Sequence, residues 1–330
     1  MGGREMIKSF EWLKMDDGTE VYLRKWEKDG TKPEAVLHIA HGMAEHGERY
    51  EQFARFLVAK GIAVFANDHR GHGKTGEKAG LMGFFAEENG FDRVVADLYA
   101  VNCRIRSLYP GVPVFLLGHS MGSFLALRYC QIYGESIRGL IPSGTGGKGG
   151  RAVKLGKMLA RLEMLRKGKR APSPFLAGLV FAGYNRKIRN PKTLFDWLSR
   201  DEQTVRAYID DPLCGFVCIA SFYYDLFTGL ELIRDPRLIR QIPKNLPVFF
   251  FSGTEDPVGG YAKEVKKMIR SLKESGMENV ESRFFPGGRH EMLNEINREE
   301  VFETVYGWME RQIGALTEGN EKNAGTDEAT

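Results

Sequence analysis

The segment PVFLLGHSMGSFLALRYC (113–130) decides the fold of this chain, because it has the pattern of a buried strand, a sharp turn and a helix. The strand part is apolar on both faces, which is typical of a central strand in a parallel sheet. GHSMG (118–122) matches G-x-S-x-G, a turn that exposes a serine hydroxyl between strand and helix. Ser120 is therefore a candidate nucleophile. The alternative is a glycine-rich turn with an incidental serine.

Further apolar runs lie on both sides of this segment and alternate with helical patterns. We predict strands at 35–40, 62–67, 139–143, 246–253 and 280–285. Such alternation is typical of a mostly parallel sheet with helices on both faces, which places the chain in the α/β class. The opening runs SFEWLKM and EVYLRKW flank an Asp-Gly pair and predict an antiparallel hairpin.

The alternation stops between residues 144 and 245, where glycines, prolines, basic residues and helical patterns occur without a clean strand signal. We interpret this segment as an insertion of about the size of a small domain. The core is then expected to comprise residues 1–143 and 246–316. The polar residues 317–330 show no apolar periodicity and are expected to be disordered.

The composition is that of an ordinary globular protein, with 42% hydrophobic and 27% charged residues. It excludes a coiled coil and low-complexity disorder. No apolar run approaches the ~20 residues of a membrane span, and the N-terminus lacks the apolar core of a signal peptide. The net charge of +4 is too small to predict nucleic-acid binding. The cysteines form no C-x-x-C pair and indicate reduced thiols of a cytoplasmic protein: Cys103, Cys130, Cys214 and Cys218.

A serine nucleophile needs a base to remove its proton and an acid to orient that base. When the serine lies on a strand-to-helix turn, the acid and the base follow it in this order, each after a later strand. Asp256 and His290 occupy these places, so both are expected at the same sheet edge as Ser120. The alternatives are that Asp256 only forms a turn, that the neighbouring Glu255 is the acid, and that His290 is an incidental loop histidine.

The loop HGMAEHGERY (41–50) follows the first parallel strand and predicts an oxyanion-binding element. The backbone N–H groups of Met43 and Met121 are the candidate donors to a developing oxyanion. Glu45 and Arg49 are spaced i, i+4 and predict a local ion pair. We expect this pair to support the loop by stiffening it.

Several histidines of this region raise the question of a metal site. His38, His41 and His46 precede Asp68 and His69, but no H-E-x-x-H or similar ligand spacing occurs. The sequence therefore predicts neither a metal ion nor a cofactor.

The chain resembles the monoacylglycerol lipase and lysophospholipase branch of the α/β-hydrolases, the serine aminopeptidase-like group, over about residues 8–315. The motifs that carry the resemblance are HGMAEHGERY, NDHRGHGKT (67–75), GHSMG, DDPLC (210–214), GTEDPV and GGRHEM. The resemblance implies an α/β-hydrolase fold with a helical lid inserted after the sixth strand. It also implies a serine ester hydrolase with a catalytic triad of Ser120, Asp256 and His290. The family often has a second glycine in the first motif, where this chain has Ala44.

The resemblance makes monoacylglycerols the first expected substrate class and lysophospholipids the second. A short-chain or aryl esterase and a peptidase follow, and an acyltransferase or cofactor-free haloperoxidase would use the same triad. The segment LAGLVFAGY (176–184) is apolar enough to line an acyl channel, with plain core packing as the alternative. A different class is a catalytically silent module that binds a ligand. The oligomeric state is left open.

The segment 151–170 is strongly basic and has helical periodicity. Its apolar stripe comprises Leu155, Met158, Leu159, Leu162 and Leu165, flanked by Lys154, Lys157 and Arg161. In one reading the leucines pack on the lid and the cations face water. In the other the helix is interfacial, with its leucines in a bilayer surface and its cations on anionic head groups, which makes the protein peripheral to a membrane.

Overall fold

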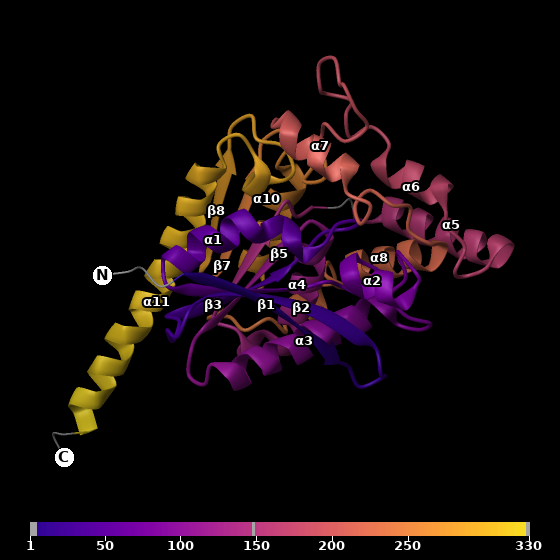
Figure 1. The fold of residues 1–330 in the computed structure, drawn as a ribbon. Helices are drawn as coiled ribbons and strands as arrows, with labels where there is room; N and C mark the ends of the chain where they lie inside the picture. The colour runs from indigo at the N-terminus through magenta and orange to yellow at the C-terminus, as the bar shows by residue number, and fades with distance from the viewer. Residues whose placement is uncertain (1–4, 147–148, 328–330) are drawn as a thin grey trace.

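The computed structural model describes residues 5–146 and 149–327, and its centre is an eight-stranded sheet (Figure 1). The strands are β1 (Met6–Lys14), β2 (Glu20–Lys28), β3 (Ala35–Ala40), β4 (Ile62–Asn67), β5 (Val114–His119), β6 (Gly139–Ser143), β7 (Val248–Gly253) and β8 (Val280–Phe285). Their order in the sheet is β1-β2-β4-β3-β5-β6-β7-β8.

The sheet is parallel from β4 to β8, and β2 alone runs the other way, because it is antiparallel both to β1 and to β4. β1 and β2 form the predicted antiparallel hairpin, with Met6 opposite Lys28, and β2 is antiparallel to β4. Every residue of β3, β4, β5, β6 and β7 is buried. Continuous apolar runs of this kind are required where helices cover both faces of a parallel sheet. The predicted fold class is confirmed.

The α-helices are α1 (Glu51–Ala59), α2 (Gly73–Ala79), α3 (Gly90–Leu108), α4 (Met121–Tyr133), α5 (Arg151–Lys167), α6 (Pro174–Phe181), α7 (Glu202–Asp210), α8 (Ala220–Leu232), α9 (Pro236–Ile239), α10 (Lys263–Glu274) and α11 (Arg298–Asp327). Helices α1 and α11 share one core cluster with the sheet, in which the rings of Phe53 and Phe302 lie 4.9 Å apart. Helices α3, α4, α8 and α10 contribute to the cluster on the other face.

The segment predicted as a lid, 144–245, lies between β6 and β7 and holds α5 to α9. Its described part contributes no strand to the sheet, and a single bridge joins Pro172 to Ile219. Helix α8 packs against α3, α4 and α5, and it therefore connects the core to the cover. Helices α5, α6 and α7 lie together at the upper right of the molecule in Figure 1. The division into core and lid stays a proposal.

The C-terminal segment differs from the expectation of disorder. Helix α11 continues to Asp327, and residues 328–330 lie outside the described part of the chain. The segment after 316 contains Glu, Lys and Ala and no proline, so the helix of the core can propagate into it without an apolar stripe. None of the helices in the described ranges combines the length and apolar character that crossing a bilayer requires.

Candidate active site

Ser120 lies at the turn between β5 and α4, with backbone angles φ 52° and ψ −119°. Such a conformation is strained for a residue other than glycine, and it persists only where the surrounding contacts hold the backbone in place. The backbone N–H of Ser120 donates to the carbonyl of Ser143 at 2.9 Å. A Cβ at Gly122 would lie 2.0 Å from the carbonyl oxygen of Ala40, so this turn can pack on β3 only with glycine there. The sequence pattern and the turn geometry agree.

Asp256 and His290 meet at the carboxyl ends of β7 and β8. The Nδ1 atom of His290 lies 3.0 Å from Oδ1 of Asp256, and both side chains are buried. The same Oδ1 accepts the backbone N–H of Val258 at 2.9 Å, which holds the carboxylate in place. The competing acid, Glu255, is exposed. The structure therefore pairs His290 with Asp256, as the sequence predicts.

The imidazole of His290 is confined by its neighbours. The ring of Trp197 lies 5.0 Å and that of His119 4.7 Å from it, centroid to centroid. A Cβ on Gly144, which has φ +53°, would approach Nδ1 of His290 to 3.1 Å. His290 and Ser120 line the same cavity. These neighbours hold the imidazole ring at the wall of the cavity that Ser120 also lines.

Electrostatics favour a basic His290. Burial disfavours the imidazolium, but the adjacent Asp256 carboxylate outweighs burial and raises the pKa of His290 above its ordinary value. Glu291 and Glu45 act in the same direction. Burial and the nearby His290 lower the pKa of His119 to about 4, so His119 stays neutral near pH 7. Of the two adjacent imidazoles, His290 is the one suited to accept a proton.

The 41–50 loop leaves β3 directly beside the serine. A Cβ on Gly42 would lie 3.2 Å from the Cβ of Ser120, and Met43 and Met121 both line the cavity. The N–H of Gly42 donates to Oε1 of Glu45 at 2.5 Å, and the Tyr50 hydroxyl donates to the same oxygen at 2.9 Å. The carboxylate of Glu45 therefore fixes the course of the loop at the position predicted to bind an oxyanion.

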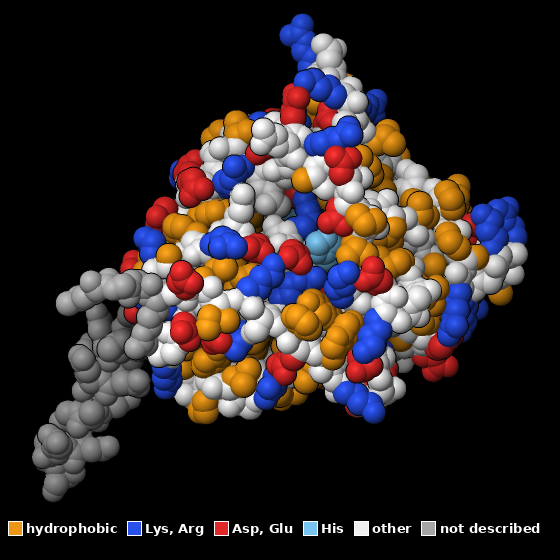
Figure 2. Space-filling view, in the orientation of Figure 1, with side chains coloured by type: hydrophobic (Ala, Val, Ile, Leu, Met, Phe, Trp, Pro, Cys, Tyr) orange, Lys and Arg blue, Asp and Glu red, His pale blue; other side chains and the backbone are white. Residues whose placement is uncertain are grey.

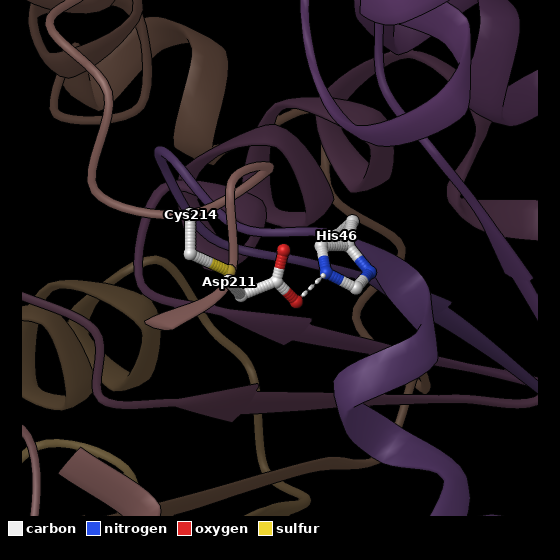
Figure 3. Close-up of side chains that lie close together, drawn as sticks. All are labelled: His46, Asp211 and Cys214. Carbon is white, nitrogen blue, oxygen red and sulfur yellow. Dashed lines mark hydrogen bonds and ion pairs between the residues drawn. The ribbon is translucent and has the colours of Figure 1, made fainter. Parts of the chain in front are cut away.

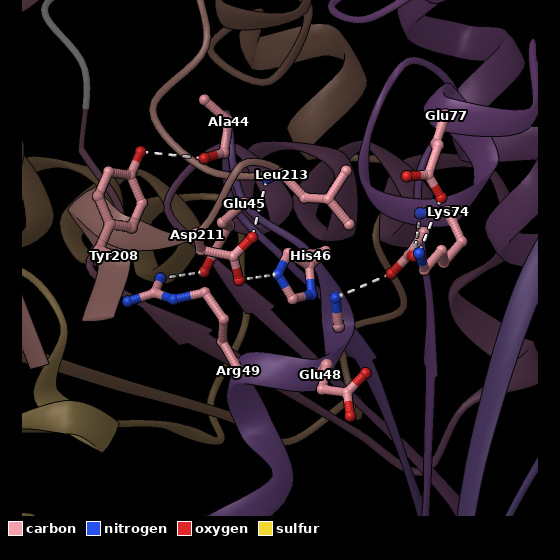
Figure 4. Close-up of polar contacts among 12 residues, drawn as sticks. Ala44, Glu45, His46, Glu48, Arg49, Lys74, Glu77, Tyr208, Asp211 and Leu213 are labelled. Atoms are coloured by element: carbon pink, nitrogen blue, oxygen red, sulfur yellow. Dashed lines mark hydrogen bonds and ion pairs between the residues drawn. The ribbon is translucent and has the colours of Figure 1, made fainter. Parts of the chain in front are cut away.

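Ala44 adopts φ +53°, a left-handed conformation that costs a residue with a Cβ more than it costs glycine. Two bonds to its carbonyl oxygen hold it there: the hydroxyl of Tyr208 donates at 3.0 Å and the N–H of Gly215 at 2.9 Å. Figure 4 shows the Tyr208 hydroxyl pointing at this carbonyl. Both donors come from the inserted segment, so the insertion stabilises the loop at the residue where the family often has glycine.

Arg49 joins the 41–50 loop to the loop that carries His290. It donates to Glu45 at 2.5 Å and makes two bonds of 2.7 Å to the carboxylate of Glu291. The predicted pair of Glu45 and Arg49 is therefore present, and Glu291 completes it. Sequence reasoning missed Glu291, although it directly follows His290. Burial opposes ionisation of Glu291, but Arg49 outweighs it and lowers the pKa of Glu291 to about 2.

The cavity beyond Ser120 has a volume of about 360 Å³, within the range of small-molecule sites. Its polar lining side chains include Glu45, His119, Ser120, His290 and Glu291. The rest is mainly apolar and comes from α4, α5, α6 and α8: Phe124, Val153, Leu155, Leu159, Leu179, Val180, Leu226, Phe227 and Leu230. Residues of the 176–184 segment therefore line the cavity.

The histidines considered as metal ligands separate into two groups. Nε2 of His38 lies 2.9 Å from Oδ1 of Asn67, and Nε2 of His41 accepts the backbone N–H of His69 at 2.9 Å. These side chains are buried parts of the core, and burial lowers their pKa values. His46 instead lies beside Asp211 and Cys214 (Figure 3), residues distant from it in the sequence.

A serine on a strand-to-helix turn, a buried histidine–aspartate pair and a helical insertion over an apolar cavity define a protein of the α/β-hydrolase class. The family model described as serine aminopeptidase, S33, matches residues 31–297. The chain belongs to this family.

Individual proteins show the same likeness. The chain is 40% identical to the human monoglyceride lipase over 293 residues, which cover 85% of this chain and 86% of that protein. It is 26% identical to phospholipase YtpA of Bacillus subtilis, over 87% of this chain and all of that one. A thermostable carboxyl esterase from Bacillus coagulans, solved in complex with glycerol, is 28% identical with a TM-score of 0.85, over 93% of this chain and 99% of that chain. The predicted class, a carboxylic ester hydrolase, is confirmed.

Proposed function

We propose that the protein hydrolyses single-chain lipid esters, with monoacylglycerol as its preferred substrate, and releases a fatty acid and glycerol. The observation that carries this proposal is the apolar cavity that begins at Ser120 and runs under the inserted helices. Removal of each buried methylene from water contributes about 0.8 kcal/mol, so such a cavity selects an acyl chain. The likeness to the human monoglyceride lipase supports the same substrate.

The reaction is a two-step acyl transfer through Ser120. His290 takes the hydroxyl proton as Oγ attacks the ester carbonyl, and Asp256 holds the imidazole in the tautomer that accepts it. The C–O bond to glycerol then breaks and His290 returns the proton to the leaving alkoxide, which leaves an acyl-enzyme. A water molecule, deprotonated by His290, attacks this ester, and the fatty acid leaves Ser120 free again.

The developing oxyanion is stabilised by the backbone N–H groups of Met43 and Met121. Both residues line the cavity next to Ser120, one on the 41–50 loop and one at the start of α4. Donors of this kind act without reorganisation because the backbone is already in place. Arg49 and Glu45 support the loop through their hydrogen bonds.

A second candidate is lysophospholipid hydrolysis, which the likeness to the Bacillus phospholipase favours. The acyl end of a lysophospholipid is the same as that of a monoacylglycerol, so the head group is the discriminating feature. We expect a higher kcat/KM on monoacylglycerols than on lysophosphatidylcholines of matched chain length. The reverse order would make lysophospholipids the substrate class. Equal rates on both and on p-nitrophenyl esters of the same chains would indicate a general carboxylesterase.

A catalytically silent binding module is the alternative from a different class. A fluorophosphonate probe separates the two cases because it reacts only with an activated serine. The wild type should be labelled stoichiometrically and Ser120→Ala not at all. Absence of labelling in the wild type would refute the proposed enzyme.

The inserted helices also provide a surface suited to a membrane. Four apolar side chains of α5 are more than half exposed: Leu155 (52%), Met158 (53%), Leu162 (53%) and Leu165 (77%). The buried face of α5 consists instead of Val153, Gly156, Ala160 and Glu163. Figure 2 shows hydrophobic and basic side chains together at the end of the molecule where Figure 1 draws α5 and α6. We assign this end to peripheral contact with anionic lipid, where a membrane-dissolved substrate is collected.

A further inference from the structure

Three side chains with different donor atoms converge beside the 41–50 loop. His46 Nε2 lies 2.9 Å from Oδ2 of Asp211, and the ligand atoms of His46, Asp211 and Cys214 all lie within 4.8 Å of one another. Figure 3 shows Cys214 and His46 on opposite sides of the Asp211 carboxylate. His46 belongs to the 41–50 loop and directly precedes the short helix Gly47–Tyr50 within it, whereas Asp211 and Cys214 belong to the turn 211–215 after α7.

The backbone presets this arrangement. In the 211–215 turn, Oδ1 of Asp211 accepts the N–H of Leu213 at 2.8 Å, and the carbonyl of Asp211 accepts the N–H of Cys214 at 3.0 Å. These bonds leave the other carboxylate oxygen, Oδ2, turned toward His46 (Figure 4). The carboxylate and the thiol therefore hold their relative positions without a metal ion.

His46 is held equally firmly from behind. A Cβ on Gly73 would lie 2.7 Å from the Cβ of His46, and the N–H of Gly47 donates to Asp68 at 2.9 Å. The imidazole is buried, and its Nδ1 has no hydrogen-bond partner among the described residues. Within the described ranges, the bond to Asp211 is thus the only one to the ring, and no other bond recorded there must break when a metal ion takes its place.

The donor set selects the class of ion. One thiolate, one imidazole and one carboxylate are the ligands of Zn²⁺ and of other borderline-soft divalent ions, whereas Mg²⁺ and Ca²⁺ prefer oxygen alone. Tetrahedral bonds of about 2.0–2.3 Å place ligand atoms about 3.5 Å apart, so ligand atoms that lie up to 4.8 Å apart must approach by about 1.3 Å at most. The Asp211 side chain is 30% exposed, which leaves access for a water molecule as fourth ligand.

The charges near the cluster are compatible with a dication. Arg49 is the nearby cation that acts on Asp211 and Cys214, and it is already paired with the carboxylates of Glu45 and Glu291. Burial raises the pKa of the Cys214 thiol, so the thiol is protonated until a metal ion binds. Binding releases this proton to solvent, and the imidazole proton, which lies on Nε2 in the hydrogen bond to Asp211, moves to Nδ1 so that Nε2 can coordinate.

We propose that His46, Asp211 and Cys214 form a binding site for Zn²⁺, and that the bound ion fastens the 211–215 turn to the 41–50 loop. The two segments already meet at the carbonyl of Ala44, which accepts the N–H of Gly215. A metal ion two residues along the loop replaces the hydrogen bond between His46 and Asp211 with a much stronger link. The bound ion therefore holds the inserted segment against the loop that lies beside Ser120.

Cobalt(II) is the probe, because its bond to a thiolate produces a charge-transfer absorption that carboxylate and imidazole ligands do not. The full chain, without a histidine tag and reduced with a phosphine, is titrated with CoCl₂ and then with ZnCl₂. We expect one Co²⁺ per chain with the thiolate band, and loss of the band as Zn²⁺ displaces Co²⁺. Absence of the band at millimolar Co²⁺ would overturn the proposal.

Matched variants locate the site. Cys214→Ser should abolish the band, and Cys103→Ser, which changes the exposed cysteine of α3, should leave it unchanged. His46→Gln and Asp211→Asn should weaken Zn²⁺ binding more than about tenfold, at least as much as the loss of an outer-shell partner. A band that survives Cys214→Ser would refute the assignment. Fluorophosphonate labelling of each variant reports folding without depending on the lipid substrate.

Hydrogen exchange tests whether the bound ion joins the 211–215 turn to the 41–50 loop. Zn²⁺ should protect both 208–215 and 43–47 in the wild type and neither in Cys214→Ser. Binding that protects only one of the two segments would contradict a link between them. Because none of these measurements uses substrate turnover, their outcome is separate from that of the proposed lipid hydrolysis.

Discussion

Arg49 makes two parallel hydrogen bonds of 2.7 Å to the carboxylate of Glu291, the residue that follows His290 in the chain. The guanidinium also stacks on the ring of Tyr208 at 4.8 Å, so it touches a residue of the inserted segment. Arg49 lies largely buried between two carboxylates, with 11% of its side chain exposed, and it stays charged because Glu291 and Glu45 outweigh burial and raise its pKa. One side chain thus connects the 41–50 loop, the histidine loop and the insertion.

Arg49→Met should destabilise the protein strongly, because it leaves the buried carboxylates of Glu45 and Glu291 unpaired. We expect the free energy of unfolding, measured by urea denaturation, to fall by about 3–5 kcal/mol. The matched control is Arg55→Met, which breaks an exposed pair with Glu51 at the same i, i+4 spacing and should cost less than about 1 kcal/mol. Equal losses of unfolding free energy in the two variants would show that the buried ion-pair network stabilises the protein no more than an exposed pair does.

Glu291→Gln should move the acid limb of the pH profile. His290 must be neutral to accept the serine proton, so kcat/KM rises with pH through the pKa of His290, which the Asp256 carboxylate raises above its ordinary value. Removing the negative charge of Glu291 lowers that pKa, and the midpoint should move to lower pH. The profile is measured on a soluble short-chain ester, with Glu255→Gln as the control. An unchanged midpoint in Glu291→Gln would contradict this electrostatic role.

Ser120→Ala should remove ester hydrolysis almost completely, by a factor on the order of 10⁴–10⁶ in kcat. Near wild-type turnover in this variant would sink the mechanism. Asp256→Asn should cost about 10⁴-fold, because the amide favours the wrong tautomer of His290. Glu255→Gln, a change of the exposed neighbour, should be mild. If these last two results were exchanged, the acid would be Glu255.

The acyl cavity predicts a preference for single long chains. Monoacylglycerols of medium and long chain should exceed glycerol monoacetate in kcat/KM, and emulsified triolein should be a poor substrate because the cavity admits one chain. Leu159 belongs to the part of the cavity wall that α5 forms, so the larger side chain in Leu159→Trp should occupy part of the cavity. This variant should lower kcat/KM for long chains and leave kcat/KM for the acetate ester unchanged. Faster hydrolysis of triolein than of monoolein would refute the assignment.

The exposed face of α5 predicts salt-sensitive binding to anionic vesicles. Lys154 and Arg161 are exposed, whereas Lys157 is paired with Glu231 at 2.7 Å. Lys154→Glu combined with Arg161→Glu should weaken flotation with phosphatidylglycerol vesicles at low salt, at about 1 kcal/mol per cation. The control, Lys266→Glu with Lys267→Glu on α10, makes the same change in net charge. If vesicle binding weakened similarly in both double variants, the effect would depend on net charge alone, and α5 would make no specific contact with the membrane.

The local chemistry of the site was readable from the sequence. A strand, a sharp turn and a helix are encoded by adjacent residues, so the placement of Ser120 followed from GHSMG and the apolar run before it. Parallel strands align their carboxyl ends, which is why the order of Ser120, Asp256 and His290 along the chain predicted one shared edge. The i, i+4 spacing predicted the pair of Glu45 and Arg49 for the same reason: local geometry suffices.

Contacts across long chain separations required the tertiary structure. Glu291 is 242 residues from Arg49, and Asp211 is 165 residues from His46, distances over which no periodicity carries information. The exposure of the α5 leucines was equally undetermined, because an amphipathic pattern specifies that one face is apolar and not what covers it. Sequence by itself determined the fold class and the candidate triad, since both depend on local pattern and order. Only the folded chain decided which charges neutralise one another, which donors share a site and which apolar face stays open, because these depend on packing between distant segments.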